Sequence, residues 1–233
     1  MGNIKYKYIL WDVDGTLLDF LAAEKAAIKA LFKKCGFGEC TDEMISEYSK
    51  INVKYWQALE RGEMTKPQIL VGRFREWFEL RGIPVIKAES FNQDYQLALG
   101  DTVVFCDNSL EVVKDLKAKG FIQAGITNGT KRAQTKKLNL SGLGDIFDYV
   151  FISEDVGVEK PNREFFDRVI SDMDILNLKE ALVIGDSLTS DIKGANNAGI
   201  DCCWYNPKGK TSDNSLKIDY EIKNIGDILD ILI

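Results

Sequence analysis

The 233-residue chain contains no histidine. This absence excludes every kind of catalytic site that depends on an imidazole side chain. Phosphatases with a histidine nucleophile, Ser-His-Asp hydrolases and zinc enzymes with histidine ligands are all excluded. Any catalysis must therefore come from carboxylates, hydroxyls, amides, thiols and basic side chains.

Cysteine occurs five times, an odd number, and no two cysteines have the C-x-x-C spacing. Cys202 and Cys203 are adjacent in an apolar run. This usage is typical of reduced, packed thiols and not of a disulfide framework. The start of the chain lacks the apolar stretch of a secretory signal, and no apolar run reaches membrane-spanning length. We therefore expect a cytoplasmic protein with no membrane partner.

The chain also lacks an excess of basic residues: 30 Lys and Arg stand against 36 Asp and Glu, for a net charge of −6. A nucleic-acid polymer is excluded as the main partner, because binding its phosphate backbone requires a basic face. A small anionic substrate needs only a local positive pocket. The length suits one α/β domain or a core with a smaller insertion, and both monomer and homodimer stay open.

Residues 20–96 have the pattern of an inserted helical domain. Apolar side chains share one face of a helix in three successive stripes, the first of which includes Ile28, Leu31 and Phe32. Glycines separate the stripes, and no strand-like run interrupts them. We expect a helical cap domain over this range.

From about residue 101 the pattern changes to alternating strands and helices. Strands are expected at 6–11, 121–126, 149–153, 181–185 and 200–205, and helices at 109–119, 130–138, 162–173 and 189–198. Short apolar strands are typical of a parallel sheet that helices cover on both faces. The sequence predicts an α/β fold with a doubly wound, mainly parallel sheet, whose core comprises residues 1–19 and 97–233.

Polar clusters follow the expected strands at four places. They are Asp12-Val-Asp-Gly-Thr16, Thr127-Asn-Gly129, Lys160-Pro161, and Gly185-Asp-Ser with Asp191. Ligands of doubly wound sheets bind beyond the carboxyl ends of the strands. One cluster alone has little weight, because strand ends routinely carry an Asp. Four clusters that supply carboxylates, a hydroxyl, free amides and a lysine predict a shared site.

These residue types suit phosphoryl transfer. A phosphomonoester dianion repels a bare carboxylate, so a cation must bridge the two and donors must hold the equatorial oxygens. Mg²⁺ suits this role because it binds oxygen ligands in an octahedron. Asp12 and Asp186 can supply two carboxylates to the metal, and Thr127 and Lys160 can hold phosphoryl oxygens.

In this order, the four motifs resemble those of the haloacid dehalogenase-like superfamily. The resemblance implies that Asp12 is a nucleophile that forms an aspartyl-phosphate. Asp14 is then the acid that protonates the leaving oxygen and the base that activates water, with its backbone carbonyl on Mg²⁺. Asp186 is implied as the second carboxylate on the metal. Ser187 and Asp191 are implied to orient the metal's ligands without binding it directly.

The resemblance also assigns the phosphate-binding residues: Thr127 and Lys160, with the backbone around Asn128 and Gly129. The presence of Asp14 distinguishes this chain from the dehalogenases of the superfamily, which lack that acid. Transport ATPases carry Asp-Lys-Thr-Gly-Thr in place of the first motif, and phosphonate hydrolases replace the second Asp. Phosphatases and phosphomutases remain.

Segments 51–56, 59–62 and 73–74 of the expected cap resemble those of the pyrimidine 5′-nucleotidase branch. This resemblance predicts that Asn52 and Arg73 contact the substrate. The aromatic residues of the cap would suit a flat base with hydrogen-bonding edges, although simple packing within the bundle explains them equally well. A phosphatase acting on a small phosphorylated metabolite, a nucleoside 5′-monophosphate, is therefore the leading prediction.

Three alternatives stay open: a phosphatase of phosphoglycolate or sugar phosphates, a sugar phosphomutase, and a non-catalytic member whose cap binds a partner. The complete set of catalytic residue types speaks against the last. Four basic residues after the second motif are expected to form a solvated helix face: Lys131, Arg132, Lys136 and Lys137.

Overall fold

A six-stranded parallel sheet forms the centre of the protein in a computed structural model that describes residues 5–212 and 215–233. Its strand order is β3-β2-β1-β4-β5-β6. The strands are β1 (Tyr8–Asp12), β2 (Ile122–Thr127), β3 (Tyr149–Ile152), β4 (Ala181–Gly185), β5 (Asp201–Tyr205) and β6 (Tyr220–Ile222). The predicted doubly wound α/β class is confirmed. Residues 1–4, which the predicted core includes, lie outside the described residues.

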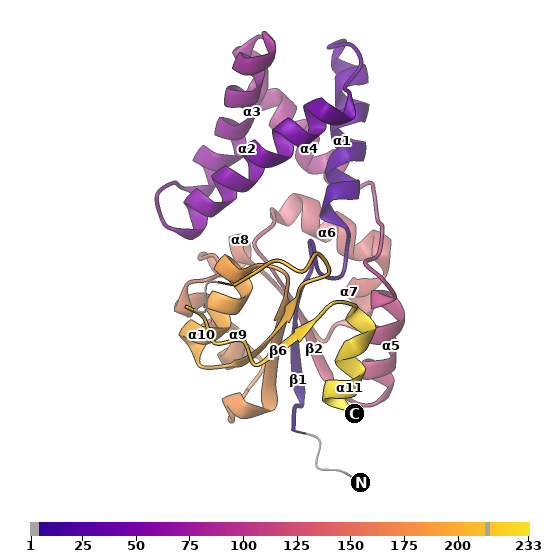
Figure 1. Cartoon of the computed structure of the whole chain (residues 1–233), viewed down its shortest axis with the longest axis vertical. Helices are drawn as coiled ribbons and strands as arrows, with labels where there is room; N and C mark the ends of the chain where they lie inside the picture. The colour runs from indigo at the N-terminus through magenta and orange to yellow at the C-terminus, as the bar shows by residue number, and fades with distance from the viewer. Residues whose placement is uncertain (1–4, 213–214) are drawn as a thin grey trace.

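Helices cover both faces of this sheet (Figure 1). One face packs against α5 (Ser109–Ala118), α6 (Lys131–Ser141), α7 (Leu143–Ile146) and α11 (Ile228–Leu232), and the other against α9 (Arg163–Asp172) and α10 (Lys193–Ala198). Short helical segments complete the connections: α8 (Ser153–Val156), η1 (Val85–Lys87), η2 (Leu178–Glu180), η3 (Leu188–Ile192) and η4 (Ile225–Asp227). Both faces of the central strands are therefore buried.

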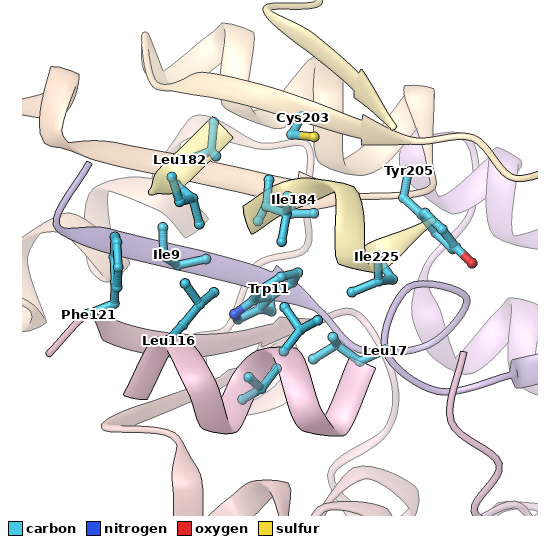
Figure 2. Packing of buried hydrophobic residues seen from close by; sticks show 14 of the residues in the cluster. Ile9, Trp11, Leu17, Leu116, Phe121, Leu182, Ile184, Cys203, Tyr205 and Ile225 are labelled. Carbon is cyan, nitrogen blue, oxygen red and sulfur yellow. The ribbon is translucent and has the colours of Figure 1, made fainter. Parts of the chain in front are cut away.

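Side-chain alternation along β1 explains its burial on both faces. Ile9 and Trp11 belong to the cluster on one face, whereas Tyr8 and Leu10 belong to the cluster on the other. Figure 2 shows Trp11 among the apolar side chains of the first cluster. Its indole Nε1 donates to Oε1 of Gln123 at 2.9 Å, so its polar atom is also satisfied. Burying an aromatic side chain contributes about 2–3 kcal/mol, which anchors the strand that carries the first motif.

Four helices stand above the carboxyl edge of the sheet (Figure 1). These are the cap helices: α1 (Phe20–Cys35), α2 (Asp42–Glu60), α3 (Lys66–Arg81) and α4 (Ala88–Leu99). They share their own apolar cluster, in which the ring centroids of Tyr48 and Phe74 stack 4.9 Å apart. Side-chain caps set where α1 and α2 begin, because Asp19 and Thr41 accept hydrogen bonds from first-turn amides. The last cap helix runs three residues past the predicted boundary at 96.

The end of the chain differs from the sequence-based expectation. The structure adds β6 at the sheet edge and α11 against the first cluster, neither of which was predicted. β6 has only three residues, and two of them are not buried, so it lacks the apolar run by which a central strand is identified. Within the described ranges, none of the helices combines the length and hydropathy needed to cross a membrane.

Candidate active site

The polar motifs meet at one edge because the strands that carry them are parallel neighbours. Asp12 is the last residue of β1, Thr127 the last of β2, and Gly185 the last of β4. Asp12 lies opposite Ile126 in the β1–β2 register, so the first two motifs leave the sheet side by side. The predicted convergence of motifs at the carboxyl edge is therefore present in the structure.

Asp12 is held by hydrogen bonds to both of its carboxylate oxygens. Lys160 Nζ donates to Oδ1 at 2.8 Å, and Thr16 Oγ1 donates to Oδ2 at 2.9 Å. The Thr16 hydroxyl also accepts from the backbone N–H of Asp186 at 3.1 Å. Thr16 thus ties the first motif to the fourth and fixes the direction of the Asp12 carboxylate.

Asp12, Asp186 and Asp191 form an acidic cluster, in which one ligand oxygen from each lies within 4.8 Å of the others. Asp12 and Asp191 are buried, and Asp186 is partly buried. Burial and the neighbouring Asp191 raise the pKa of Asp12 well above its usual value. The same two causes raise the pKa of Asp186 to about 6. Crowded carboxylates of this kind favour binding of a cation, and a set of oxygen donors fits a hard divalent ion such as Mg²⁺.

Lys160 is the cation within this cluster. Its Nζ donates to Asp12, to Asp191 Oδ1 at 2.7 Å and to the carbonyl of Ile126 at 2.9 Å. Burial alone would lower the pKa of Lys160, but the carboxylates of Asp12 and Asp191 raise it above its usual value. One lysine stands against three carboxylates, so the cluster keeps an excess of negative charge.

Asp191 and Asn128 both bind Lys160 by hydrogen bonds, Asp191 at its side chain and Asn128 at its backbone. Asp191 Oδ2 accepts from the backbone N–H of Ser187 at 3.1 Å, while its Oδ1 binds Lys160. The Asn128 side chain brackets the backbone of Lys160, donating to its carbonyl at 2.8 Å and accepting from its N–H at 2.9 Å. The Asn128 side chain thus joins the second motif to the backbone of Lys160.

Two glycines permit close packing at the acidic cluster, Gly15 between the first and fourth motifs and Gly185 within the fourth. Gly15 has a φ of +97°, and a Cβ there would lie 2.8 Å from Asp186 Oδ1. A Cβ on Gly185 would lie 2.3 Å from Asp191 Oδ2. Any side chain at either position would displace a carboxylate of the cluster, and at Gly15 it would also strain the backbone.

The four motifs line a cavity of about 170 Å³, and the cap helices contribute part of its lining. Its core residues are Asp12, Asp14, Thr127, Asn128, Gly129, Lys160, Asp186, Ser187, Ser190 and Asp191. The cap contributes two aromatic rings and one carboxylate, from Phe20, Trp56 and Glu60. The cavity therefore combines a polar floor with a partly aromatic roof.

Glu60 joins the roof of the cavity to its floor. Its carboxylate accepts a hydrogen bond from Thr189 Oγ1 at 2.6 Å, which links the end of α2 to η3. Burial, together with the nearby charge of Asp191, raises the pKa of Glu60 to about 7. A carboxyl group in this position can accept or donate a hydrogen bond near neutral pH.

The carboxylate of Asp14 binds two side chains of α6. Gln134 Nε2 donates to Oδ2 at 2.6 Å, and Lys137 Nζ forms an ion pair with Oδ1. The prediction that Lys137 belongs to a solvated helix face is wrong, since its side chain is 1% exposed. Lys131 and Lys136 do face outward and pair with acidic residues of other segments. Because α6 turns Lys137 inward beneath the cap, its burial depends on tertiary packing.

Asn52 and Arg73, predicted to contact substrate, lie in a buried network inside the cap. Asn52 Nδ2 donates to Glu24 Oε2 at 2.9 Å, and Arg73 donates to the Asn52 carbonyl at 2.5 Å and to Asn92 at 3.4 Å. Neither side chain lines the cavity. The structure does not bring them to the motifs, although the Arg73 guanidinium lies 6.0 Å from the ring of Trp56.

No role in the site was predicted for Thr16, Phe20, Glu60 or Gln134, and for the aromatic residues of the cap, which include Trp56, stacking on a base and packing within the bundle were both left open. Thr16 lay within the first motif and could have been selected as the only hydroxyl there. Phe20 and Glu60 occupy the two ends of cap helices that point toward the sheet, a placement that helix faces alone do not reveal.

Comparison with known proteins agrees with this geometry. Residues 9–205 match the family model of haloacid dehalogenase-like hydrolases. The chain is 35% identical over 228 residues to the HAD-hydrolase YfnB of Bacillus subtilis, covering 98% of this chain and 96% of YfnB. It is 35% identical over 228 residues to the pyrimidine 5′-nucleotidase PynA of Streptococcus pneumoniae, covering 97% and 95%.

The pyrimidine 5′-nucleotidase YjjG of Escherichia coli is 27% identical over 229 residues, covering 98% of this chain and 99% of YjjG. A crystal structure of YfnB, described as bound to magnesium and as revealing interdomain movement, superposes with a TM-score of 0.92 at 34% identity, covering 98% and 99% of the two chains. The fold over almost the whole chain is thus shared with YfnB. The chain belongs to the haloacid dehalogenase-like hydrolase family.

Proposed function

We propose that this protein is a Mg²⁺-dependent phosphatase that hydrolyses nucleoside 5′-monophosphates through an aspartyl-phosphate on Asp12. The observation that carries the proposal is the position of Asp12 at the floor of a cavity that has Lys160 beside it and Phe20 and Trp56 in its roof. Two of the relatives are named as pyrimidine 5′-nucleotidases, which supports the same substrate class.

The carboxylates of Asp12 and Asp186, with the backbone carbonyl of Asp14, would hold the metal. Bound there, Mg²⁺ would neutralise the excess charge of the cluster and bring a phosphate dianion next to a carboxylate. Asp191 has both oxygens occupied by Lys160 and Ser187, so we assign it to holding these two residues. The magnesium described for the YfnB crystal structure supports this choice of ion.

In the first step, a carboxylate oxygen of Asp12 forms a bond to phosphorus as the bond from phosphorus to the nucleoside 5′-oxygen breaks. Lys160 and the Thr127 hydroxyl hold equatorial phosphoryl oxygens, together with the backbone amides that follow Thr127. Asp14 gives its proton to the leaving oxygen, so that the nucleoside departs as an alcohol.

In the second step, water attacks the phosphorus of the aspartyl-phosphate and gives a proton to Asp14. The bond between phosphorus and Asp12 then breaks, which releases inorganic phosphate and restores the Asp12 carboxylate. The hydrogen bond from Thr16 keeps this carboxylate pointing into the cavity through both steps. Asp14 thus regains the proton that it gave up in the first step.

The cap helices, over residues 20–96, would decide which leaving group fits. An in-line attack by Asp12 directs the leaving group away from the sheet and toward the roof of the cavity. There Trp56 and Phe20 offer aromatic faces for a base, and Glu60 offers a hydrogen-bonding partner for its edge. Phe20 and Asp14 also line a neighbouring cavity of about 550 Å³, so a group larger than phosphate has room.

Steady-state kinetics with Mg²⁺ over nucleotides, sugar phosphates and phosphoglycolate tests this proposal. We expect kcat/KM for dUMP or dTMP to exceed that for phosphoglycolate by at least about tenfold, which is about 1.4 kcal/mol of differential binding in the transition state. Trp56→Ala should reduce this ratio toward one, because phosphoglycolate has no base to stack. A preference for phosphoglycolate or a hexose phosphate over every nucleotide would overturn the nucleotidase assignment.

A further inference from the structure

Both oxygens of the Asp14 carboxylate are occupied by donors from a single helix, α6. Gln134 and Lys137 are three residues apart on this helix, so their side chains lie on the same face and reach one carboxylate together. The contact joins the first motif to the helix that directly follows the second motif. It thus connects the proposed acid–base residue with the phosphate-binding segment.

Lys137 is a buried cation whose surroundings are specific. Its side chain is 1% exposed, and its Nζ lies 5.4 Å from the ring centroid of Phe20, which lines the cavity. Burying an ammonium group is costly unless it is paired, and Asp14 supplies the pairing carboxylate. Lys137 therefore lies between the acid–base residue and the first residue of the cap helices.

Gln134 is packed against the second motif as well as against Asp14. A Cβ on Gly129 would lie 2.2 Å from Gln134 Nε2, so the amide passes directly beneath the phosphate-binding segment. Its Oε1 is buried and has no hydrogen-bond partner among the described residues. A buried amide with an unused acceptor costs stability, so this position is poorly explained by packing alone.

We propose that Lys137 and Gln134 are positioning residues that set the direction of the Asp14 carboxylate for proton transfer. The proposal rests on the acid–base role of Asp14 proposed above. An aspartate side chain can point in several directions, and proton transfer requires one of its oxygens within hydrogen-bond reach of the leaving oxygen. Two donors with fixed positions on α6 restrict that freedom, because each of them holds one oxygen of the carboxylate.

The alternative is that Lys137 and Asp14 form a purely structural ion pair. Loss of a structural pair would slow all substrates alike, because it would disturb folding or the whole site. Loss of a positioning residue would slow mainly those substrates whose leaving group needs a proton. A nucleoside alkoxide needs one, whereas p-nitrophenolate departs without it, so the two substrates separate the two roles.

The test compares Lys137→Met with Lys136→Met, a matched substitution at the neighbouring residue of α6, which pairs with Asp101 at the surface. The measurement is kcat/KM with Mg²⁺ for dUMP and for p-nitrophenyl phosphate, because this parameter covers the steps up to departure of the leaving group. We expect Lys137→Met to lower kcat/KM about tenfold or more for dUMP and less than about threefold for p-nitrophenyl phosphate. Lys136→Met should leave both unchanged.

The same substitution in an Asp14→Asn background shows whether Lys137 acts through Asp14. If Lys137 only positions Asp14, the ratio of kcat/KM for dUMP to kcat/KM for p-nitrophenyl phosphate should be the same in the double variant as in Asp14→Asn. Equal losses on both substrates, or an undiminished selective loss in the Asp14→Asn background, would overturn the proposal. If Lys137→Met does not fold, Gln134→Leu removes the second donor and must give the same selective loss. If Asp14→Asn itself affects both substrates equally, the acid–base role of Asp14 is the assumption that fails.

Discussion

Removal of the Asp186 carboxylate should stabilise the metal-free protein, and Mg²⁺ should largely offset this gain because it stabilises the wild type more than the variant. Burial of Asp186 and the negative charge of the nearby Asp191 raise the pKa of Asp186 from 3.8 to about 6. Without metal, the charged form of Asp186 therefore destabilises the folded state. Asp186→Asn removes that charge, so we expect the metal-free variant to be more stable than the wild type at pH 8.

The pKa shift sets the magnitude of this effect. A pKa raised from 3.8 to about 6 corresponds to about 3 kcal/mol, an upper value because the amide loses hydration as well. For a chain of this length, about 1 kcal/mol moves the melting temperature by about 2–4 °C, which gives an increase of up to roughly 6–12 °C. Because the raised pKa belongs to an acid, the destabilisation is absent below pH 3.8 and complete above pH 6.

Thermal unfolding in EDTA and in excess Mg²⁺ measures both parts of this prediction. Mg²⁺ at about 100 times its dissociation constant should stabilise the wild type by about 2.7 kcal/mol and the variant by much less. Asp145→Asn, at an exposed position of α7, is the matched control and should leave the melting temperature unchanged both in EDTA and in Mg²⁺. A metal-free variant less stable than the wild type at pH 8, or equal stabilisation of both by Mg²⁺, would refute this reasoning.

Three further predictions concern single residues. Asp14→Asn should lower kcat/KM by about 10²–10⁴-fold for a nucleoside monophosphate and by less for p-nitrophenyl phosphate, as measured by steady-state kinetics. Thr16→Val removes a donor to Asp12 and an acceptor for the Asp186 amide, and it should cost about 1–3 kcal/mol in urea unfolding. Burial would raise the pKa of Asp201, but hydrogen bonds from Lys179 and other donors lower it well below its usual value. The charged carboxylate therefore stabilises the fold, and this stabilisation is lost in acid. The stability difference between wild type and Asp201→Asn should be largest near pH 7 and shrink below about pH 4.

The sequence predicted the sheet and its motifs well because both depend on local patterns. β4, for example, has the predicted bounds of 181–185, since a short apolar run that ends in Gly-Asp is distinctive. Parallel topology then requires Asp12, Thr127 and Asp186 to meet at one edge, whatever the exact packing. The resemblance to a known family supplied the roles, which residue types alone left open.

The cap was predicted as a set of helices above the site, but the residues that line the site were not identified correctly. Asn52 and Arg73 are polar residues on helices above the sheet, a position compatible with either substrate or interior contacts. Glu24, on another helix, decides between them by supplying a buried carboxylate that Asn52 can bind. Such a partner 28 positions away in the chain is not visible in a helical stripe.

The burial of Lys137 in the catalytic domain was likewise not predictable from the local sequence. Arg132 and Lys136 on the same helix are charged, Arg132 is exposed and Lys136 is half-buried, so the local pattern indicates a solvated face. The burial of Lys137 follows from the position of Asp14, 123 residues away, which compensates the charge. Pairing between distant charged groups is set by the assembled fold and not by the periodicity of one helix.

Detection of phosphate on Asp12 tests the central claim most directly. The enzyme is mixed with dUMP and Mg²⁺, quenched with acid within one turnover, and digested for peptide mass spectrometry. We predict a phosphorylated peptide that contains Asp12, with the phosphate absent from the Asp12→Asn variant and from samples chelated before mixing. Turnover of dUMP by a wild-type enzyme that never carries phosphate on that peptide, or an Asp12→Asn variant that keeps a tenth of wild-type turnover, would contradict the account.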